Sequence, residues 1–153
     1  MRDAWLMNME LQDLYQKTMI QHGNNPLNFG KPQEYDHTEE GFNALCGDKI
    51  NIYFRRMENK VINFSFVSVG CIVCKASGSL MTEELNKKNL ENVATSIDNA
   101  MIGINKGNLK NNFFSNELMT LNEIKKFPSR LKCALLPWET AMRLLKNMKN
   151  NVR

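Results

Sequence analysis

The alternation of apolar and polar residues predicts a β-hairpin in the middle of the chain. Apolar side chains occupy every second position over residues 50–54 and again over residues 62–66, which is typical of half-buried strands. Pairing the two apolar faces gives an antiparallel register in which Ile50 lies opposite Phe66. One further short strand is expected within the loop of residues 24–45, so the predicted sheet has about three strands.

The same register brings two cysteines to one end of the hairpin. Cys46 falls opposite Gly70, which directly precedes Cys71 in the sequence. In a regular ladder the two cysteine side chains would point to opposite faces of the sheet, so their sulfurs can meet only if the ladder bulges or breaks. Glycine permits such a break, and we therefore expect an irregularity at Gly70.

Segments whose apolar residues recur at helical spacing precede and follow the hairpin. The first is stopped by the Gly-Asn-Asn-Pro stretch that begins at Gly23. The last contains Pro137, which predicts a kink or a division into two pieces. Together these patterns predict an α+β fold, a small antiparallel β-sheet covered by helices, in one domain over residues 1–153. The helices are expected over residues 9–21, 73–82, 89–104 and the segment that follows Pro128.

Composition and charge narrow the classes of protein. The chain has 153 residues, of which 42% are hydrophobic and 24% charged, so it can bury an ordinary core without disulfides. Its net charge of +4 comes from scattered basic residues, whereas nucleic-acid binding needs a denser stripe. No apolar run reaches the roughly 20 residues of a membrane span, and the first ten residues resemble neither a signal peptide nor a transit peptide. We expect a cytoplasmic protein with no nucleic-acid or membrane partner.

Four cysteines in a reducing compartment favour metal binding or thiol catalysis over disulfides. Cys46 and Asp48 stand two positions apart, and the hairpin brings Cys71 to them. Cys133 lies near the start of the last helix. Three sulfurs and one carboxylate are a suitable ligand set for four-coordinate Zn²⁺, with Zn–S bonds of about 2.3 Å. Since these ligands come from separate segments, we expect a preformed site that can be opened, unlike a zinc module that only holds a fold together.

The fourth cysteine admits two interpretations. Cys71 and Cys74 form a C-x-x-C pair, which suggests thiol–disulfide chemistry, but the βαβ context of redox proteins is missing and Ile-Val separates the two cysteines. Cys74 is expected to pack as a small apolar residue. A role as an auxiliary thiol, either a resolving thiol or a substitute ligand, stays open.

Four motifs follow one another along most of the chain. They are His22-Gly-Asn-Asn-Pro-Leu-Asn-Phe-Gly30, Ala44-Leu-Cys-Gly-Asp48, Gly70-Cys71 with Ala76-Ser-Gly-Ser-Leu-Met-Thr82, and Phe127-Pro-Ser-Arg-Leu-Lys-Cys-Ala-Leu-Leu-Pro-Trp138. In this order they resemble the SufU branch of the NifU/IscU (NifU N-terminal) family of iron–sulfur cluster assembly proteins. The resemblance covers about residues 10–146 and implies an IscU/SufU-like fold.

Two features indicate the branch. Lys132 stands where IscU-type members carry His directly before the last cysteine, and residues 105–125 look like the insertion of the SufU branch. The resemblance implies a Zn²⁺ site whose ligands are Cys46, Asp48, Cys71 and Cys133. It also implies that Cys46 accepts persulfide sulfur from a SufS-like, PLP-dependent cysteine desulfurase, and that Arg130, which lies near the site, is a second catalytic residue.

Other activities would use the same ligands and stay open. One alternative is a scaffold that holds iron or a transient [2Fe–2S] cluster and passes it to cluster assembly or acceptor proteins, because soft thiolates also suit iron–sulfur chemistry. Another is a structural zinc or protein-binding module, and whether the chain is an enzyme, a sulfurtransferase, is left undecided. The chain departs from the family at several positions: residues 41–44 lack the usual Asn-Pro before Cys46, and Cys74 stands where the family usually has Ser. The departure at Cys74 is the one that bears on the chemistry, because it adds a fourth sulfur near the site.

Overall fold

The computed structural model describes residues 4–57 and 62–150, with side chains from residue 10 onward. It has the α+β architecture that the sequence predicts, and each predicted helix is present. In chain order the elements are α1 (Ala4–Asn24), β1 (His37–Asn43), β2 (Asp48–Arg56), β3 (Ile62–Val69), α2 (Ile72–Leu85), α3 (Leu90–Lys106), α4 (Asn116–Met119), the 3-10 helix η2 (Thr120–Lys126) and α5 (Pro128–Asn150).

Within the described residues, three antiparallel strands form one sheet in the order β1-β2-β3. Ile52 of β2 lies opposite Phe66 of β3. The predicted register, with Ile50 in that place, is therefore wrong by two residues. A shift of two leaves every side chain on its own face of the sheet, so the apolar pattern cannot distinguish the two registers. The observed register places Phe54 opposite Phe64, with their ring centroids 5.2 Å apart in an edge-to-face contact.

The corrected register changes which residue lies beside the glycine at the end of β3. Asp48, and not Cys46, is level with Gly70, because Lys49 pairs with Val69. The ladder ends at Val69 and Gly70 has a φ of 119°, so the ladder breaks at this glycine as predicted. A Cβ atom at Gly70 would lie 2.5 Å from Asp48 Oδ1. Glycine is required here by the backbone conformation and by the neighbouring carboxylate together.

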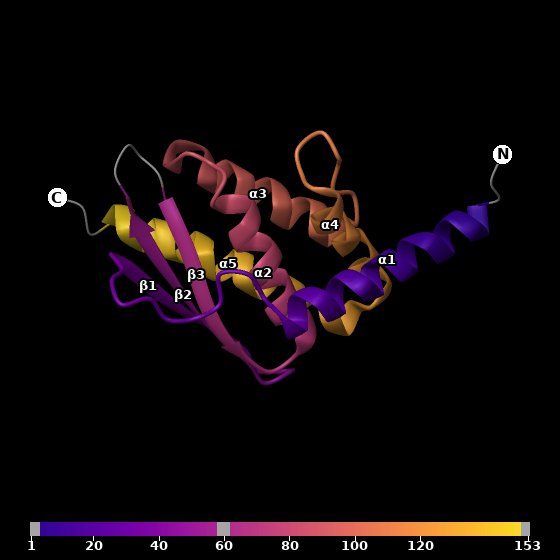
Figure 1. Cartoon of the computed structure of the whole chain (residues 1–153), viewed down its shortest axis with the longest axis horizontal. Helices are drawn as coiled ribbons and strands as arrows, with labels where there is room; N and C mark the ends of the chain where they lie inside the picture. Colours follow the sequence, from indigo (N-terminus) through magenta and orange to yellow (C-terminus); the bar gives the residue numbers. More distant parts are fainter. Residues whose placement is uncertain (1–3, 58–61, 151–153) are drawn as a thin grey trace.

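Helices α2 and α5 pack on one face of the sheet, and α3 packs against α5 (Figure 1). Trp138 of α5 donates from Nε1 to Ser77 Oγ of α2 over 3.0 Å, and both side chains are fully buried. This packing holds α5 against β1 and β2, the two strands that meet at the predicted site. The fully buried sheet residues beneath the helices are Ile50, Ile52, Phe54, Phe64 and Phe66.

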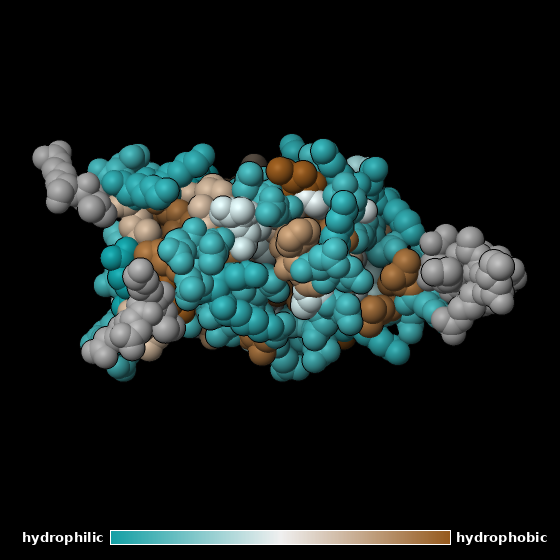
Figure 2. Space-filling view, turned by 90° about the horizontal axis from the view of Figure 1, so that it is seen from above, coloured by the Kyte–Doolittle hydropathy of each residue, from teal (hydrophilic) through white to brown (hydrophobic). Residues whose placement is uncertain are grey.

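The outer edge of β3 is paired by a short segment of the loop that follows α1. Phe66 donates its N–H to the carbonyl of Asn28 over 3.1 Å, and Gly30 donates to the carbonyl of Phe66 over 2.8 Å. The segment therefore satisfies backbone groups that an open sheet edge would leave exposed. The face in Figure 2 is mainly hydrophilic, with separate hydrophobic patches. Each helix in the described part of the chain is too short or too polar to cross a membrane.

Helix α5 is continuous through Pro137. Of the two predicted outcomes, the division into two pieces is therefore wrong, and the kink stays a prediction. Proline removes one hydrogen bond from a helix, here the bond that an N–H of residue 137 would donate to the carbonyl of Cys133. The flanking Leu136 and Trp138 are 5% and 0% exposed. Their burial in the core keeps the helix in one piece despite the missing bond.

The segment predicted as an insertion, residues 105–125, forms the end of α3, a loop, α4 and most of η2. His22 of α1 lies between this segment and α2: its Nδ1 is 2.7 Å from Ser79 Oγ, and its Nε2 is hydrogen-bonded to the carboxylate of Glu117 in α4. The segment is thus joined to the rest of the fold by a polar contact as well as by apolar ones. Its buried apolar residues are Leu109, Leu118, Leu121 and Ile124.

Candidate metal centre

Three of the predicted ligands converge at the end of the sheet where β2 begins. Cys46 lies in the turn between β1 and β2, Asp48 is the first residue of β2, and Cys133 lies in the second turn of α5. One ligand atom from each of these three side chains lies within 4.8 Å of the other two. A tetrahedral zinc site with bonds of about 2.3 Å has ligand–ligand distances of roughly 3.8 Å, so small side-chain movements would complete this part of the site.

The fourth predicted ligand lies beside this group but faces a different partner. The backbone N–H of Cys71 donates to Asp48 Oδ1 over 2.6 Å. The Cys71 thiol is the N-cap of α2, where it accepts from the N–H of Val73 at 3.4 Å. It also accepts from Nη1 of Arg130 at 3.3 Å. Cys71 is therefore next to the other ligands through its backbone, while its sulfur caps a helix.

The three cysteines near Asp48 differ in how far they are accessible. Cys46 is half-buried, and its thiol faces the carbonyl of Ser129 at 3.7 Å. Cys71 is also half-buried, whereas Cys133 is fully buried. Burial raises the pKa of the Cys133 thiol, and hydrogen bonds with Asp48 and Cys46 raise it further. Without a cation, the thiol of Cys133 stays protonated at neutral pH.

The chemistry of these donors fits a divalent cation of intermediate softness. Asp48 is 1% exposed and Cys133 is 0% exposed, so two acidic side chains lie buried next to each other. A bound cation would replace the proton of Cys133 and offset the repulsion between the thiolate and the carboxylate. Cysteine sulfurs with one carboxylate oxygen are ligands that Zn²⁺ accepts, and thiolates also suit iron in iron–sulfur clusters.

Arg130 takes part in the electrostatics of the site. Its guanidinium is exposed on α5 and is held at the Cys71 sulfur. The negative charge of Cys71 is the largest cause that raises the pKa of Arg130, and Cys133 and Cys46 act in the same direction. The guanidinium thus places a positive charge beside the sulfur of Cys71.

Cys74 lies in the core and has no contact with the three converging ligand atoms at hydrogen-bond distance among the described residues. It is 1% exposed, and burial raises the pKa of its thiol to about 12, with the charges of Asp48 and Cys71 adding to the effect. A thiol with this pKa is protonated at neutral pH, which fits the expectation that Cys74 packs as a small apolar residue. Its role as an auxiliary thiol stays a prediction.

Two residues near the site were not expected from the sequence. Asn43 was considered only as part of a departure from a motif, yet its side chain contacts Asp48 and Cys133. Tyr15 of α1 is half-buried and stacks on Phe127 with ring centroids 6.2 Å apart. Burial is the main cause that raises the pKa of Tyr15, and the charge of Cys71 contributes next. Helical periodicity could only identify Tyr15 as apolar packing, whereas the position of Asn43 three residues before Cys46 was a usable signal.

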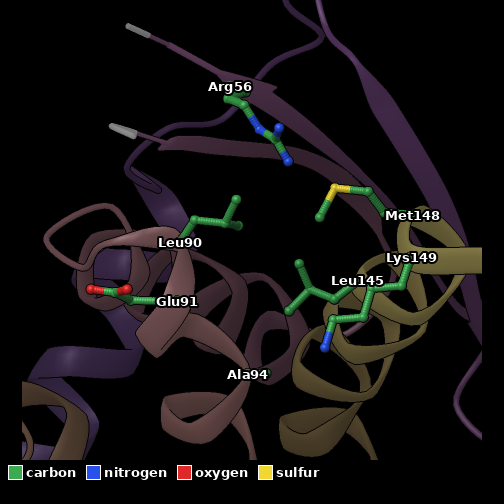
Figure 3. Close-up of a pocket in the computed structure, with 7 residues that line it drawn as sticks. All are labelled: Arg56, Leu90, Glu91, Ala94, Leu145, Met148 and Lys149. Atoms are coloured by element: carbon green, nitrogen blue, oxygen red, sulfur yellow. The ribbon is translucent and has the colours of Figure 1, made fainter. Parts of the chain in front are cut away.

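A second hollow lies at the other end of the sheet and differs in chemistry. It has a volume of about 400 Å³, and Leu90, Leu145 and Met148 point into it while Arg56 reaches over it (Figure 3). Arg56 ends β2 and Asp48 begins it, so at about 3.3 Å per residue the hollow is roughly 26 Å from the converging ligands. The cysteine and aspartate side chains described above do not line it.

Comparison with known proteins places this arrangement in a family. The model of the family described as NifU-like N terminal domain matches residues 14–134. The chain is 29% identical to the iron-sulfur cluster assembly scaffold protein IscU of Thermotoga maritima, over 92% of this chain and 98% of that protein. It is also 29% identical to the zinc-dependent sulfurtransferase SufU of Bacillus subtilis, over 86% and 89%. The crystal structure of FiSufU from Fervidobacterium islandicum AW-1 superposes with a TM-score of 0.75 at 26% identity, covering 86% of this chain and 96% of that one.

Proposed function

The chain belongs to the NifU-like N-terminal domain family, and from this premise we propose that it works in iron–sulfur cluster assembly. The observation that carries the proposal is the convergence of Cys46, Asp48 and Cys133 from a turn, a strand and a helix to within 4.8 Å. Relatives over most of its length include a cluster assembly scaffold and a zinc-dependent sulfurtransferase. Both activities need thiolates held together in a site that a partner protein can reach.

Within this function we favour a zinc-dependent sulfurtransferase. Its zinc ligands would be Cys46, Asp48, Cys71 and Cys133. Bound Zn²⁺ would keep the sulfurs deprotonated and protect them from oxidation. The features that favour this branch are Lys132 before the last cysteine and the segment of residues 105–125, which includes α4 and most of η2. The donor set of buried Cys133 and Asp48 with half-buried Cys46 supports it chemically.

We assign the acceptor role to Cys46. Its thiol lies in an exposed turn between Leu45 and Gly47, whereas the sulfur of Cys133 is fully buried. The thiolate of Cys46 attacks the outer sulfur of a persulfide on a SufS-like, PLP-dependent cysteine desulfurase. A new S–S bond forms on Cys46, the S–S bond of the desulfurase persulfide breaks, and the cysteine thiolate of the desulfurase leaves. Arg130 is the second residue that we assign to this reaction, because its guanidinium donates to the Cys71 sulfur at 3.3 Å and places a positive charge beside the site.

We place this reaction in the cytoplasm, where cysteines stay reduced. All four cysteines of the sequence lie in the described residues and are free thiols. Three of them lie close to one another, so an oxidising compartment would favour disulfides over metal binding. The sulfur would then pass to cluster assembly or acceptor proteins.

The second candidate function is that of a scaffold for a [2Fe–2S] cluster. The observation that favours it is the 98% coverage of the Thermotoga maritima scaffold protein. Cysteine thiolates are the usual ligands of such clusters, and the cluster would be cargo that the protein builds and passes on. The same four side chains would then hold iron in place of zinc.

The test measures metal content and desulfurase stimulation in the same preparation. We expect about one zinc per chain by elemental analysis and faster sulfide release by a SufS-like desulfurase. Cys46→Ser should abolish the stimulation, and the matched control Cys74→Ser should keep it, because Cys74 lies in the core. Full stimulation by Cys46→Ser would refute the acceptor assignment.

Two other outcomes separate the remaining alternatives. A coloured, stable cluster after incubation with iron and sulfide, with no stimulation of the desulfurase, would favour the scaffold. Unfolding on zinc removal, with no response from the desulfurase, would instead indicate a structural zinc module.

A further inference from the structure

The strand pairing places Asn43 beside the proposed metal centre. It is the last residue of β1 and lies opposite Asp48, the first residue of β2. Residues 44–47 connect the two and carry Cys46. Side chains directly opposite each other on antiparallel strands share one face of the sheet. The last pair of this ladder therefore brings an amide and a carboxylate together at the base of the turn that holds the proposed acceptor cysteine.

The amide of Asn43 contacts two proposed ligands from different elements. Its Nδ2 is 3.3 Å from Asp48 Oδ2 and 3.5 Å from the sulfur of Cys133 on α5. The Asn43 side chain is 8% exposed, so solvent does not compete strongly for these hydrogen bonds. A primary amide has two N–H donors, which is the number needed to serve both acceptors.

Asp48 is held from two sides. Oδ2 accepts from Asn43, and Oδ1 accepts from the backbone N–H of Cys71 at 2.6 Å. Asp48 is 1% exposed. Its carboxylate fits in this position because Gly70 has no Cβ, which would lie 2.5 Å from Oδ1. A carboxylate offers about four acceptor positions, so two hydrogen bonds leave lone pairs for a cation.

We propose that Asn43 is a positioning residue of the metal centre. Its amide sets the orientation of Asp48 and Cys133 before the metal binds, and the turn between Asn43 and Asp48 then keeps Cys46 beside them. When the metal leaves, the same amide remains as a hydrogen-bond donor to two buried acidic groups. The inference rests on the proposed metal site and extends it to a residue that does not itself ligate the metal.

A role in packing alone makes a different prediction. If Asn43 only filled space, a side chain of similar volume without an amide would replace it. Asn43→Leu removes both donors but keeps the branched shape and the number of heavy atoms of the side chain, whereas Asn43→Ala removes the donors and most of the side chain. Hydrogen bonds that orient metal ligands are typically worth 10- to 100-fold in metal affinity. Asn43→Leu and Asn43→Ala should therefore lose affinity to a similar degree.

The matched control is an asparagine at the other end of α2. Asn86 caps this helix, and its side chain accepts from the N–H of Phe64 at 2.7 Å and donates to the carbonyl of Phe64 at 3.1 Å. Like Asn43, it joins a helix to the sheet by side-chain hydrogen bonds. It lies about 20 Å from Cys71, given the length of α2. Asn86→Ala should lower stability without changing the metal site.

The experiment measures Zn²⁺ affinity of the full chain by competition with a chromophoric chelator. We expect a loss of about 10- to 100-fold for Asn43→Leu and Asn43→Ala, and a change of less than about twofold for Asn86→Ala. Wild-type affinity in Asn43→Leu, or an equal loss in Asn86→Ala, would overturn the inference. Failure of the wild-type chain to bind Zn²⁺ would instead refute the proposed metal site, so the two failures are distinguishable.

A second measurement uses the metal-free protein. The backbone N–H of Cys71 reports the position of Asp48, because the two share the 2.6 Å hydrogen bond. In ¹H–¹⁵N spectra, both Asn43 variants should shift the Cys71 amide proton upfield and speed its exchange with solvent, and Asn86→Ala should leave it unchanged. An unchanged Cys71 amide in both Asn43 variants would show that Asn43 does not orient Asp48.

Discussion

Replacing Gly70 by alanine is expected to damage the fold and the proposed metal centre together. The backbone at Gly70 has a φ of 119°, a conformation that a side chain strains. The new Cβ would also lie 2.5 Å from Asp48 Oδ1 and 2.9 Å from the Cα of Asp48. The second contact is with backbone, which cannot move aside as a flexible side chain does. Gly70→Ala should therefore displace the start of β2.

The backbone strain and the clash of the new Cβ with Asp48 can be separated by substituting a second glycine. Gly30 has a φ of 136°, and a Cβ built there meets nothing within 4 Å. Gly30→Ala thus carries the backbone strain without the clash, at about 1–3 kcal/mol of unfolding free energy. Gly70→Ala carries a similar strain plus about 1–3 kcal/mol for the overpacked contact. The difference between the variants, about 1–3 kcal/mol, corresponds to roughly 2–12 °C in Tm.

Urea and thermal unfolding of the metal-free variants would give this difference without a contribution from bound metal. Zn²⁺ competition on the same samples should show at least about tenfold weaker binding for Gly70→Ala and no change for Gly30→Ala. Equal destabilisation of the two variants would refute the steric argument. Wild-type Zn²⁺ affinity in Gly70→Ala would refute the claim that Asp48 must stay in its place.

Three further outcomes follow from buried groups. Trp138→Phe leaves Ser77 Oγ without the donor it has at 3.0 Å, so urea unfolding should show a loss of about 1–3 kcal/mol; no loss would contradict it. Zn²⁺ affinity should rise from pH 6 to pH 8, because binding displaces the proton that the raised pKa of Cys133 retains; a flat profile would argue against thiolate ligands. The folded pKa of Cys74, about 12, lies above the unfolded value of 9.0. The unfolded state therefore loses its proton first, and stability should fall by about 1.4 kcal/mol per pH unit between pH 9 and about pH 12. Cys74→Ala should remove this pH-dependent loss of stability. If the variant and the wild-type chain had the same dependence of stability on pH, the burial of the Cys74 thiol would be contradicted.

The sequence predicted the sheet and its helices because both depend on periodicity. The period of two in residues 50–54 and 62–66 identified the strands, and Gly70 was recognised as the point where the ladder breaks. The register failed by two residues, since a two-residue slip preserves the faces of the sheet and only direct contacts such as Phe54 with Phe64 distinguish the alternatives. Helix α5 does not divide at Pro137, because the neighbours of Pro137 are buried and local propensity does not include that burial.

The sequence indicated which residues make up the candidate site, but it could not indicate the hydrogen bonds between them. Residue type and spacing indicated Cys46, Asp48 and Cys133, which the structure brings together. They could not indicate that Cys71 offers its backbone to Asp48 and its sulfur to a helix end. Nor could they assign donors to Asn43, because a hydrogen bond between residues 90 positions apart depends on how α5 packs against β1.

The Cys71 sulfur caps the N-terminus of α2, so binding of a ligand at this sulfur would affect the helix. A cation or persulfide that engages Cys71 competes for the electron pair now offered to the N–H of Val73. The opening turn of α2 would then loosen by about 0.5–2 kcal/mol, the usual worth of a lost cap. The first turn of α2 carries the exposed Ile72. A partner protein that contacts this turn would thus distinguish the ligand-bound from the ligand-free form without contacting the ligand residues themselves.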